Sequence, residues 1–190
     1  MDAFLPDTYE PPKSTSGYMK LQDGKNKFRI LSSPILGWEY WTQKDWKKMP
    51  IRLPYTEENY RTAQREAQKN DDEQSKKAKH FWEMVVWNYN TNAIEILELV
   101  QAKMQKSIRD TSSEPEWGNP VNKYDFVITK TGKGMDTEYS MTAIPPSTTA
   151  PEITKAFKEK PINLQALFEG GNPFEEASVD EAFVADTFTL

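Results

Sequence analysis

The chain has 190 residues, of which 37% are hydrophobic and 28% charged, and it contains no cysteine. This length fits one domain with room for tails. The absence of cysteine excludes disulfides, thiolate nucleophiles and cysteine-based zinc sites, and it fits a reducing, cytoplasmic setting. No apolar run approaches the ~20 residues that a bilayer-spanning helix needs, and the first residues lack the basic stretch of a secretory signal.

The formal net charge of −5 is unevenly distributed along the chain. Residues 13–133 hold 21 of the 24 Lys and Arg and 16 of the 29 Asp and Glu, a local net charge of +5. Residues 1–12 carry a charge of −3, and residues 134–190 carry −7. A basic body with acidic ends suggests a polyanionic partner, although many proteins without such a partner also have uneven charge.

The sequence of the N-terminal half predicts an irregular N-terminal segment, two strands and a helical insertion. Residues 1–17 are rich in Pro, Ser, Thr and Asp, which is typical of irregular chain. Apolar and polar side chains then alternate at about 26–32 and 37–42, as in half-buried strands. Residues 56–79 are polar and free of Gly and Pro, and they begin with the N-cap residue Thr56, so we expect a solvated helix inserted between strands.

Two β-hairpins are expected after the insertion. The first turns at the asparagines of 90–92, and the second turns through Gly132 and Gly134. In both hairpins the flanking residues are β-branched or aromatic and alternate with polar residues. The four strands lie at 81–89, 93–99, 124–129 and 137–142.

A short helix at about 101–109 is expected to close one end of the sheet with Met104 and Ile108. Together with about six short strands, it favours a small closed or partly closed barrel over an open sheet, because closure leaves fewer exposed edges. The predicted fold class is therefore mainly β with helical insertions, in one domain spanning residues 18–145.

The C-terminal region predicts a linker and an acidic tail. Residues 146–168 start with a proline-rich stretch and carry a weakly amphipathic helix at 152–168. Residues 169–190 contain six acids and no basic residue, so this segment cannot bury enough surface to fold alone. We expect a disordered tail that recruits a protein partner through its acids and aromatics, namely Glu175, Glu176, Asp180, Glu181, Phe183, Asp186 and Phe188.

Residues 38–52 are the first candidate for a nucleic-acid site. Single strands expose base faces and phosphates, so a binder needs aromatic side chains with Lys or Arg beside them. This stretch has four aromatics and four cations in fifteen positions, and core packing would account for one or two of the aromatics. The predicted stacking residues are Tyr40, Trp41, Trp46 and Trp87, and the predicted phosphate contacts are Lys27, Arg29, Lys44, Lys47, Lys48 and Arg52.

Trp82 and Trp87 have opposite parity on one predicted strand, so they cannot share a face of a single sheet layer. One of them is therefore a candidate stacking platform and the other a core residue. Burial of both, one of them under the 56–79 insertion, remains the alternative.

Catalytic signatures are weak in this sequence. His80 is the only histidine, no Gly-x-Ser-x-Gly elbow is present, and the glycines at 132 and 134 lack phosphate-loop spacing. Asp136 and Glu138 could in principle hold Mg²⁺ as in nucleases, but such pairs are usually solvated charges. We expect no enzyme activity, no metal and no cofactor.

Eight segments follow one another in a recognisable order, namely Tyr18–Leu21, Asn26–Leu31, Gly37–Trp41, Lys79–Trp82, Val86–Tyr89, Trp117–Gly118, Tyr124–Gly132 and Asp136–Tyr139. In this order they resemble bacteriophage single-stranded-DNA-binding proteins, over about residues 18–145. That resemblance implies an OB-fold, a role in DNA replication, recombination and repair, cooperative coating of DNA with possible self-association, and an acidic tail that recruits replication proteins. Members from T4-like phages carry a Cys/His zinc site, and this chain has no cysteine, so zinc is not expected.

The sequence therefore predicts a binder of single-stranded DNA without sequence preference, located in the host cytoplasm if a phage encodes it. Two alternatives from other classes remain open. A protein-interaction module would use the exposed tryptophans as hot spots, and a metal-dependent nuclease would use the acidic pair on the second hairpin. RNA binding is a variant of the main prediction, because contacts to phosphates and base faces need not sense the 2′-hydroxyl.

Overall fold

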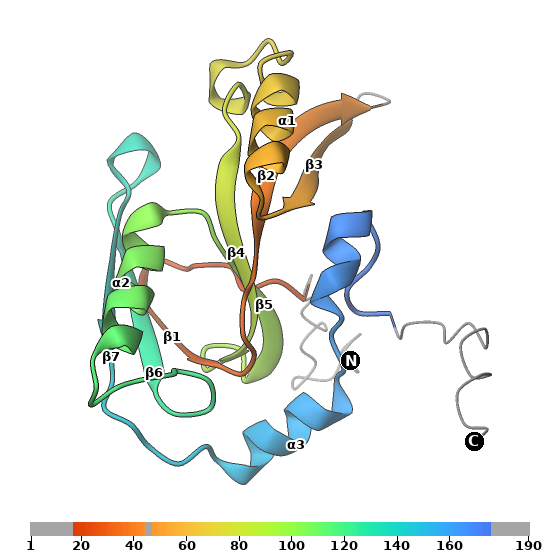
Figure 1. Cartoon of the computed structure of the whole chain (residues 1–190). Coiled ribbons are helices and arrows are strands. Elements are labelled where there is room, and N and C mark those ends of the chain that lie inside the picture. The colour runs from red at the N-terminus through yellow and green to blue at the C-terminus, as the bar shows by residue number, and fades with distance from the viewer. Residues whose placement is uncertain (1–16, 45–46, 176–190) are drawn as a thin grey trace, which may run out of the picture.

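The computed structural model describes residues 17–44 and 47–175 (Figure 1). Seven strands and three α-helices account for most of this range, with three short 3₁₀ turns between them. In chain order the elements are β1 (Gly24–Ile30), β2 (Ile35–Lys44), β3 (Lys47–Pro54), α1 (Glu57–Ala67), η1 (Glu73–Ser75), β4 (Lys79–Asn88), β5 (Ala93–Leu99), α2 (Ala102–Ser113), β6 (Asp125–Thr131), η2 (Gly134–Asp136), β7 (Glu138–Ala143), α3 (Pro151–Glu159) and η3 (Leu164–Glu169).

The strands form one antiparallel sheet in the order β3-β2-β4-β1-β6-β7, and β5 pairs with β4 on its other edge. β1 and β2 follow one another along the same edge of β4, separated by Leu31–Pro34. The fold is mainly β and of a small barrel-like OB type, which confirms the predicted class. The sheet has seven strands instead of five or six, and within the described residues no pairing joins β7 to β5, so the barrel is not closed.

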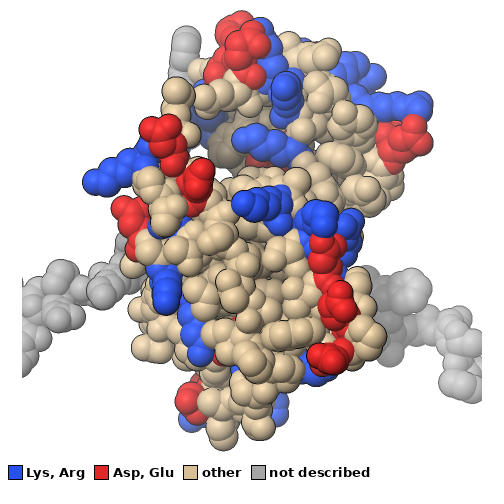
Figure 2. Space-filling model, turned by 90° about the vertical axis from the view of Figure 1, so that its left-hand side faces the viewer, with Lys and Arg blue, Asp and Glu red and all other residues tan. Residues whose placement is uncertain are grey.

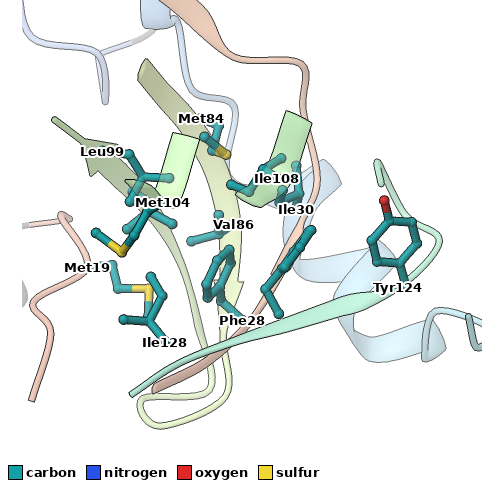
Figure 3. Packing of buried hydrophobic residues seen from close by; sticks show 12 residues of the cluster. Met19, Phe28, Ile30, Met84, Val86, Leu99, Met104, Ile108, Tyr124 and Ile128 are labelled. Atoms are coloured by element: carbon teal, nitrogen blue, oxygen red, sulfur yellow. The ribbon is translucent and has the colours of Figure 1, made fainter. Parts of the chain in front are cut away.

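The first hydrophobic core lies inside the curved sheet and under α2 (Figure 3). Phe28, Met84, Val86 and other inward-facing side chains of the strands fill it, and Met104 is almost fully buried with them. A buried apolar side chain contributes about 1.5–3 kcal/mol, so this layer is a main source of stability. The predicted capping role of the 101–109 helix is confirmed.

A second core lies on the opposite face of β4 and β5, where alternate residues point away from the first. Ile153 of α3 and Leu164 and Leu167 of η3 cover Val85 and Ile96 of the sheet. The helix predicted at 152–168 is present as α3 and η3, whereas the expectation that this stretch only links the domain to the tail is wrong, because its apolar residues are part of the second core. The apolar outer face of the β4–β5 hairpin needs a cover, and this segment provides it.

β2, β3 and α1 project beyond the barrel and are called the arm below (Figure 1). β2 and β3 pair along their whole length, and α1 packs its buried Ala63 and Ala67 against them. The Thr56 hydroxyl accepts a hydrogen bond from Asn59 N at 3.1 Å, which confirms the predicted N-cap. Among the helices of the described residues, none has the length and apolar character needed to cross a membrane.

Candidate nucleic-acid interface

Arg29 is buried and cannot make the predicted phosphate contact. It is 1% exposed, and its Nε donates to Asp125 while Nη2 donates to Ser147 Oγ at 2.6 Å. Nη1 donates to Thr149 Oγ1 at 2.8 Å. The guanidinium therefore ties β1 to β6 and to the segment that leads to α3. Alternation along β1 places Arg29 on the opposite face from the first core, where its direct partner on the neighbouring strand β6 is Asp125.

Arg52 is also consumed by carboxylates. Its Nη2 lies 3.1 Å from Glu39, 3.0 Å from Glu83 and 2.6 Å from Glu98. Glu83 is fully buried and Glu39 is 2% exposed. These four residues are called the Arg52 cluster, and the predicted phosphate contact at Arg52 is corrected accordingly.

The Arg52 cluster has more negative than positive groups, and this changes its protonation. The pKa of Glu83 is raised to about 8, chiefly by burial, and the neighbouring Glu98 and Glu39 act in the same direction while Arg52 opposes them. Burial also raises the pKa of Glu39. Although Arg52 lies close to Glu83, neither oxygen of Glu83 has a hydrogen-bond partner within the described residues. A buried carboxylate without hydrogen bonds is costly, so the neutral, protonated form of Glu83 is favoured near neutral pH.

The predicted stacking residues are mostly covered. Trp87 is 8% exposed in the second core, so its predicted role on bases is corrected, and Trp82 on the other face of β4 is the more accessible of the pair. Trp41 is half-buried and donates from Nε1 to Glu39 at 3.0 Å. Tyr40, which belongs to β2 of the arm, is half-buried, and burial raises the pKa of its hydroxyl.

The remaining predicted cations keep some freedom. Lys47 and Lys48 are exposed near the tip of the arm, and Lys48 lies 3.4 Å from Asp72 in a weak surface pair. Lys27 is 40% exposed at its side chain, 3.0 Å from Asp125 and over the Tyr89 ring at 4.2 Å. The Lys44 side chain and Trp46 lie outside the described positions.

Four rings gather where the arm meets β4. Trp38 stacks on Tyr55 with ring centroids 5.5 Å apart and an interplanar angle of 22°. Tyr60 of α1 lies 4.6 Å from Trp38, and His80 lies 5.1 Å from it. Trp38 is half-buried between these neighbours, whereas Tyr55 is 56% and Tyr60 40% exposed. The outer rings are therefore partly open to solvent, and the inner rings pack against them.

Hydrogen bonds extend this group along β4. His80 Nδ1 donates to the Gly37 carbonyl at 2.9 Å, and its Nε2 accepts from Trp82 Nε1 at 3.0 Å. An indole N–H only donates and a carbonyl only accepts, so the neutral His80 tautomer with its proton on Nδ1 satisfies both bonds. Leu36, 38% exposed, pairs with Trp82 across the strands. The aromatic strip comprises Leu36, Trp38, Tyr55, Tyr60, His80 and Trp82.

The aromatic strip holds three of the five large hydrophobic side chains that are exposed in the described residues, the others being Met49 and Met135. Contiguous exposed apolar surface of this kind marks an interaction site. Figure 2 shows Lys and Arg side chains around a hollow between the arm and the part of the molecule formed by α2. The exposed or half-exposed cations on the bordering elements are Arg61 of α1, Lys76, Lys77 and Lys79 before and at the start of β4, and Lys103, Lys106 and Arg109 of α2.

Sequence reasoning missed the outer members of the strip. Tyr55 follows a strand and Tyr60 lies in a helix, so no periodicity within one element connects them to Trp38. One signal was available, since Trp38 and Tyr40 share a strand face that also faces the helix following Thr56. The predicted basic and aromatic stretch at 38–52 does contribute Trp38 and the lysines at the arm tip.

The acidic pair proposed for Mg²⁺ is exposed on the second hairpin. Within residues 17–44 and 47–175, no group of three His, Asp or Glu side chains could hold a metal ion. Of the predicted partner-binding tail, only Glu175 belongs to the described part of the chain, where its side chain is exposed. The rest of the tail set, Glu176, Asp180, Glu181, Phe183, Asp186 and Phe188, lies beyond it.

No protein-family model matches the sequence, and no curated protein matches it either.

Proposed function

We propose that this chain binds single-stranded DNA without sequence preference, as a stoichiometric binder and not an enzyme, in DNA replication, recombination and repair. The observation that carries the proposal is the aromatic strip. The rings of Tyr55 and Tyr60 are exposed, and they are held by contacts with Trp38 and, for Tyr55, also with His80. Rings held in this way lose little entropy when a base stacks on them.

The chemistry of the strip favours single strands over duplexes. An unpaired base can lay its face on an exposed ring, a contact worth about 1–3 kcal/mol per base, whereas the bases of a duplex are already stacked. The cations that border the strip lie on α1, on the residues just before and at the start of β4, and on α2. No ion pair involves Lys77, Lys79 or Lys103 within the described residues, so these ammonium groups are free to contact phosphates.

The acidic tail has a second role under this proposal, as the part that recruits replication proteins. Its acids would be repelled by DNA and its phenylalanines would dock on a protein surface. Deletion of residues 176–190 is expected to leave affinity for DNA equal or higher and to abolish capture of a replication partner. Lower affinity for DNA after this deletion would contradict the role.

A protein-interaction module is the second candidate, because Leu36 adds an exposed aliphatic group to the strip. The two candidates differ in their response to salt. Stacking combined with phosphate contacts predicts binding that weakens steeply with salt, whereas docking of an apolar partner does not.

A competition titration tests the proposal. A fluorescent dT oligonucleotide of about 16 nucleotides, the upper site size for one OB fold, is bound by the full chain and displaced with unlabelled dT, oligo-U or duplex DNA of equal length. Displacement by dT at much lower concentration than by duplex supports the proposal, and oligo-U shows whether RNA is also accepted. Equal displacement by duplex, or no binding of dT at low salt, overturns it.

A further inference from the structure

A pocket of about 190 Å³ opens beside the aromatic strip, between α2 and the sheet. Trp82 and Met84 of β4 form its floor, and Pro34 and Pro120 come from the two loops that flank it. Its other lining residues are Ile30, Ser33, Ile108, Arg109, Ser112, Asn119 and Val121. Trp82 therefore belongs both to the strip and to the pocket.

The walls of the pocket are mainly apolar, and its polar side chains are Ser33, Arg109, Ser112 and Asn119. Asn119 Oδ1 accepts from Val121 N at 3.0 Å, which fixes the amide and leaves Nδ2 without a hydrogen bond within the described residues. Arg109 is 64% exposed at its side chain and uses Nε and Nη2 on Asp110, leaving Nη1 unbonded in that same set of residues. An indole side chain, two rigid prolines and free N–H donors suit a flat heterocycle with acceptor atoms on its edge.

We propose that this pocket receives one unstacked nucleobase of the bound strand, with the Arg109 guanidinium against the adjoining phosphate. The inference rests on the proposed function and extends it, because it adds an enclosed site for a single base to a strip that binds base faces. Trp82 is oriented for this role by its hydrogen bond to His80. Asn119 Nδ2 donates to carbonyl oxygens or ring nitrogens on the base edge, which every base offers in some form.

The charge around the pocket favours a nucleic acid as its occupant. Lys103, Lys106 and Arg109 all lie on α2, the helix that forms one wall. A base enters with its phosphate attached, so a cation at the rim is matched by a negative group on the ligand. The continuity of the pocket with the strip through Trp82 gives the strand a short path from Tyr55 and Tyr60.

Two neighbouring serines of α2 provide a matched test. Ser112 and Ser113 each donate to the Arg109 carbonyl at 2.8 Å, but only Ser112 lines the pocket. Ser112→Leu fills the pocket with an apolar group that cannot stack, whereas Ser113→Leu makes the same chemical change outside it. Ser33→Leu fills the pocket from another element and replaces Ser112→Leu if that variant does not fold.

The measurements are the affinity for a dT oligonucleotide and the NMR resonance of the Trp82 indole N–H, assigned with Trp82→Phe. Ser112→Leu is expected to weaken binding about fivefold or more, equivalent to the loss of about 1 kcal/mol of stacking, and to abolish the DNA-induced shift of the Trp82 resonance. Ser113→Leu is expected to match the wild type in both measurements.

The outcomes separate this inference from the function on which it rests. If the wild type binds dT and Ser112→Leu binds it equally well, the pocket takes no base and the strip alone accounts for binding. If the wild type fails to bind dT, the proposed function and the pocket assignment fall together.

Discussion

The two faces of the arm and the adjoining end of β4 divide their residues in opposite ways. On one face, Trp38, His80 and Trp82 support rings that remain open to solvent. On the other face, the alternate residues Glu39 and Arg52 are drawn into a buried ionic cluster. Charges are thus placed inside and aromatic rings outside, the reverse of the usual sorting of side chains.

The comparison shows that a count of basic residues does not measure the positive charge available to a polyanion. Arg29 is paired with Asp125 and Arg52 with three glutamates of the same sheet, so neither arginine is free for phosphate. The cations that remain lie on the helices and loops that border the strip. Buried ion pairs are often no more stabilising than apolar residues of equal size, so the Arg52 cluster is better understood as a device that fixes the packing of the arm on the barrel.

The largest effect is expected when the Arg52 cluster loses its cation. Arg52→Met leaves Glu39 and Glu98 without a counter-charge, and removal of one partner from a buried ion pair destabilises a protein by about 3–5 kcal/mol. Urea denaturation at neutral pH measures the free energy of unfolding. Lys48→Met, at an exposed position of the same strand, is the control and should change it by less than about 0.5 kcal/mol. Equal effects would show that the cluster has no structural role.

Loss of one outer ring of the strip comes next. Tyr60→Ala is expected to weaken binding to dT by about 1–3 kcal/mol, the worth of one stacked base, while the fold persists because the ring is 40% exposed. Fluorescence anisotropy at constant salt measures the change. Met135→Ala removes another exposed apolar side chain, away from the strip, and should leave the affinity unchanged.

The buried acid Glu83 of the Arg52 cluster is expected to make the stability of the protein depend on pH. The pKa of Glu83 is about 8 in the folded chain, above its ordinary value of 4.5. Its contribution to stability is therefore fully present below the unfolded pKa and is lost as pH rises through the folded one. Glu83→Gln mimics the protonated acid and does not titrate. Between pH 6 and 9 the wild type should therefore lose at least about 1 kcal/mol more of its free energy of unfolding than Glu83→Gln loses.

Thermal unfolding at several pH values measures this difference. Glu138→Gln, at an exposed position of β7, is the control and should follow the wild type. Parallel profiles for Glu83→Gln and the wild type would mean that Glu83 does not titrate in this window.

The smallest effect is expected at the arm tip. Lys47→Ala and Lys48→Ala together remove two exposed cations, and the removal of each phosphate-binding lysine should flatten the slope of log affinity against log salt by about 0.7. The matched double variant Lys155→Ala/Lys158→Ala removes two cations of α3, on the side of the second core. If both double variants change the slope equally, the arm tip has no special role in binding DNA.

Alternation along the strands predicted much of the fold. Both hairpins, the helix that contributes Met104 to the first core and the insertion that begins at Thr56 all lie where the sequence indicated. These elements depend on local patterns, because a strand with one buried face must alternate and a helix must begin with a capped turn.

The C-terminal cover and the candidate site could not be predicted from local patterns, because both depend on contacts between distant segments. Ile153 and Leu164 lie in the stretch where the sequence predicts a helix, but nothing local shows that they cover the β4–β5 hairpin. Which arginines are neutralised depends on the pairing of strands far apart in the chain, as with Arg29 and Asp125. The strip is assembled in the same way, from a strand, a loop and a helix.

The path of the strand is the central claim, and photocross-linking measures it most directly. A dT oligonucleotide with 5-iodouracil in place of some thymines is irradiated in complex with the full chain, and the modified peptides are mapped. Cross-links at Tyr55 and Tyr60 are predicted, at the free ring faces of the strip. Cross-links confined to the second core or to the C-terminal segment, with these two tyrosines unmodified, would contradict the account.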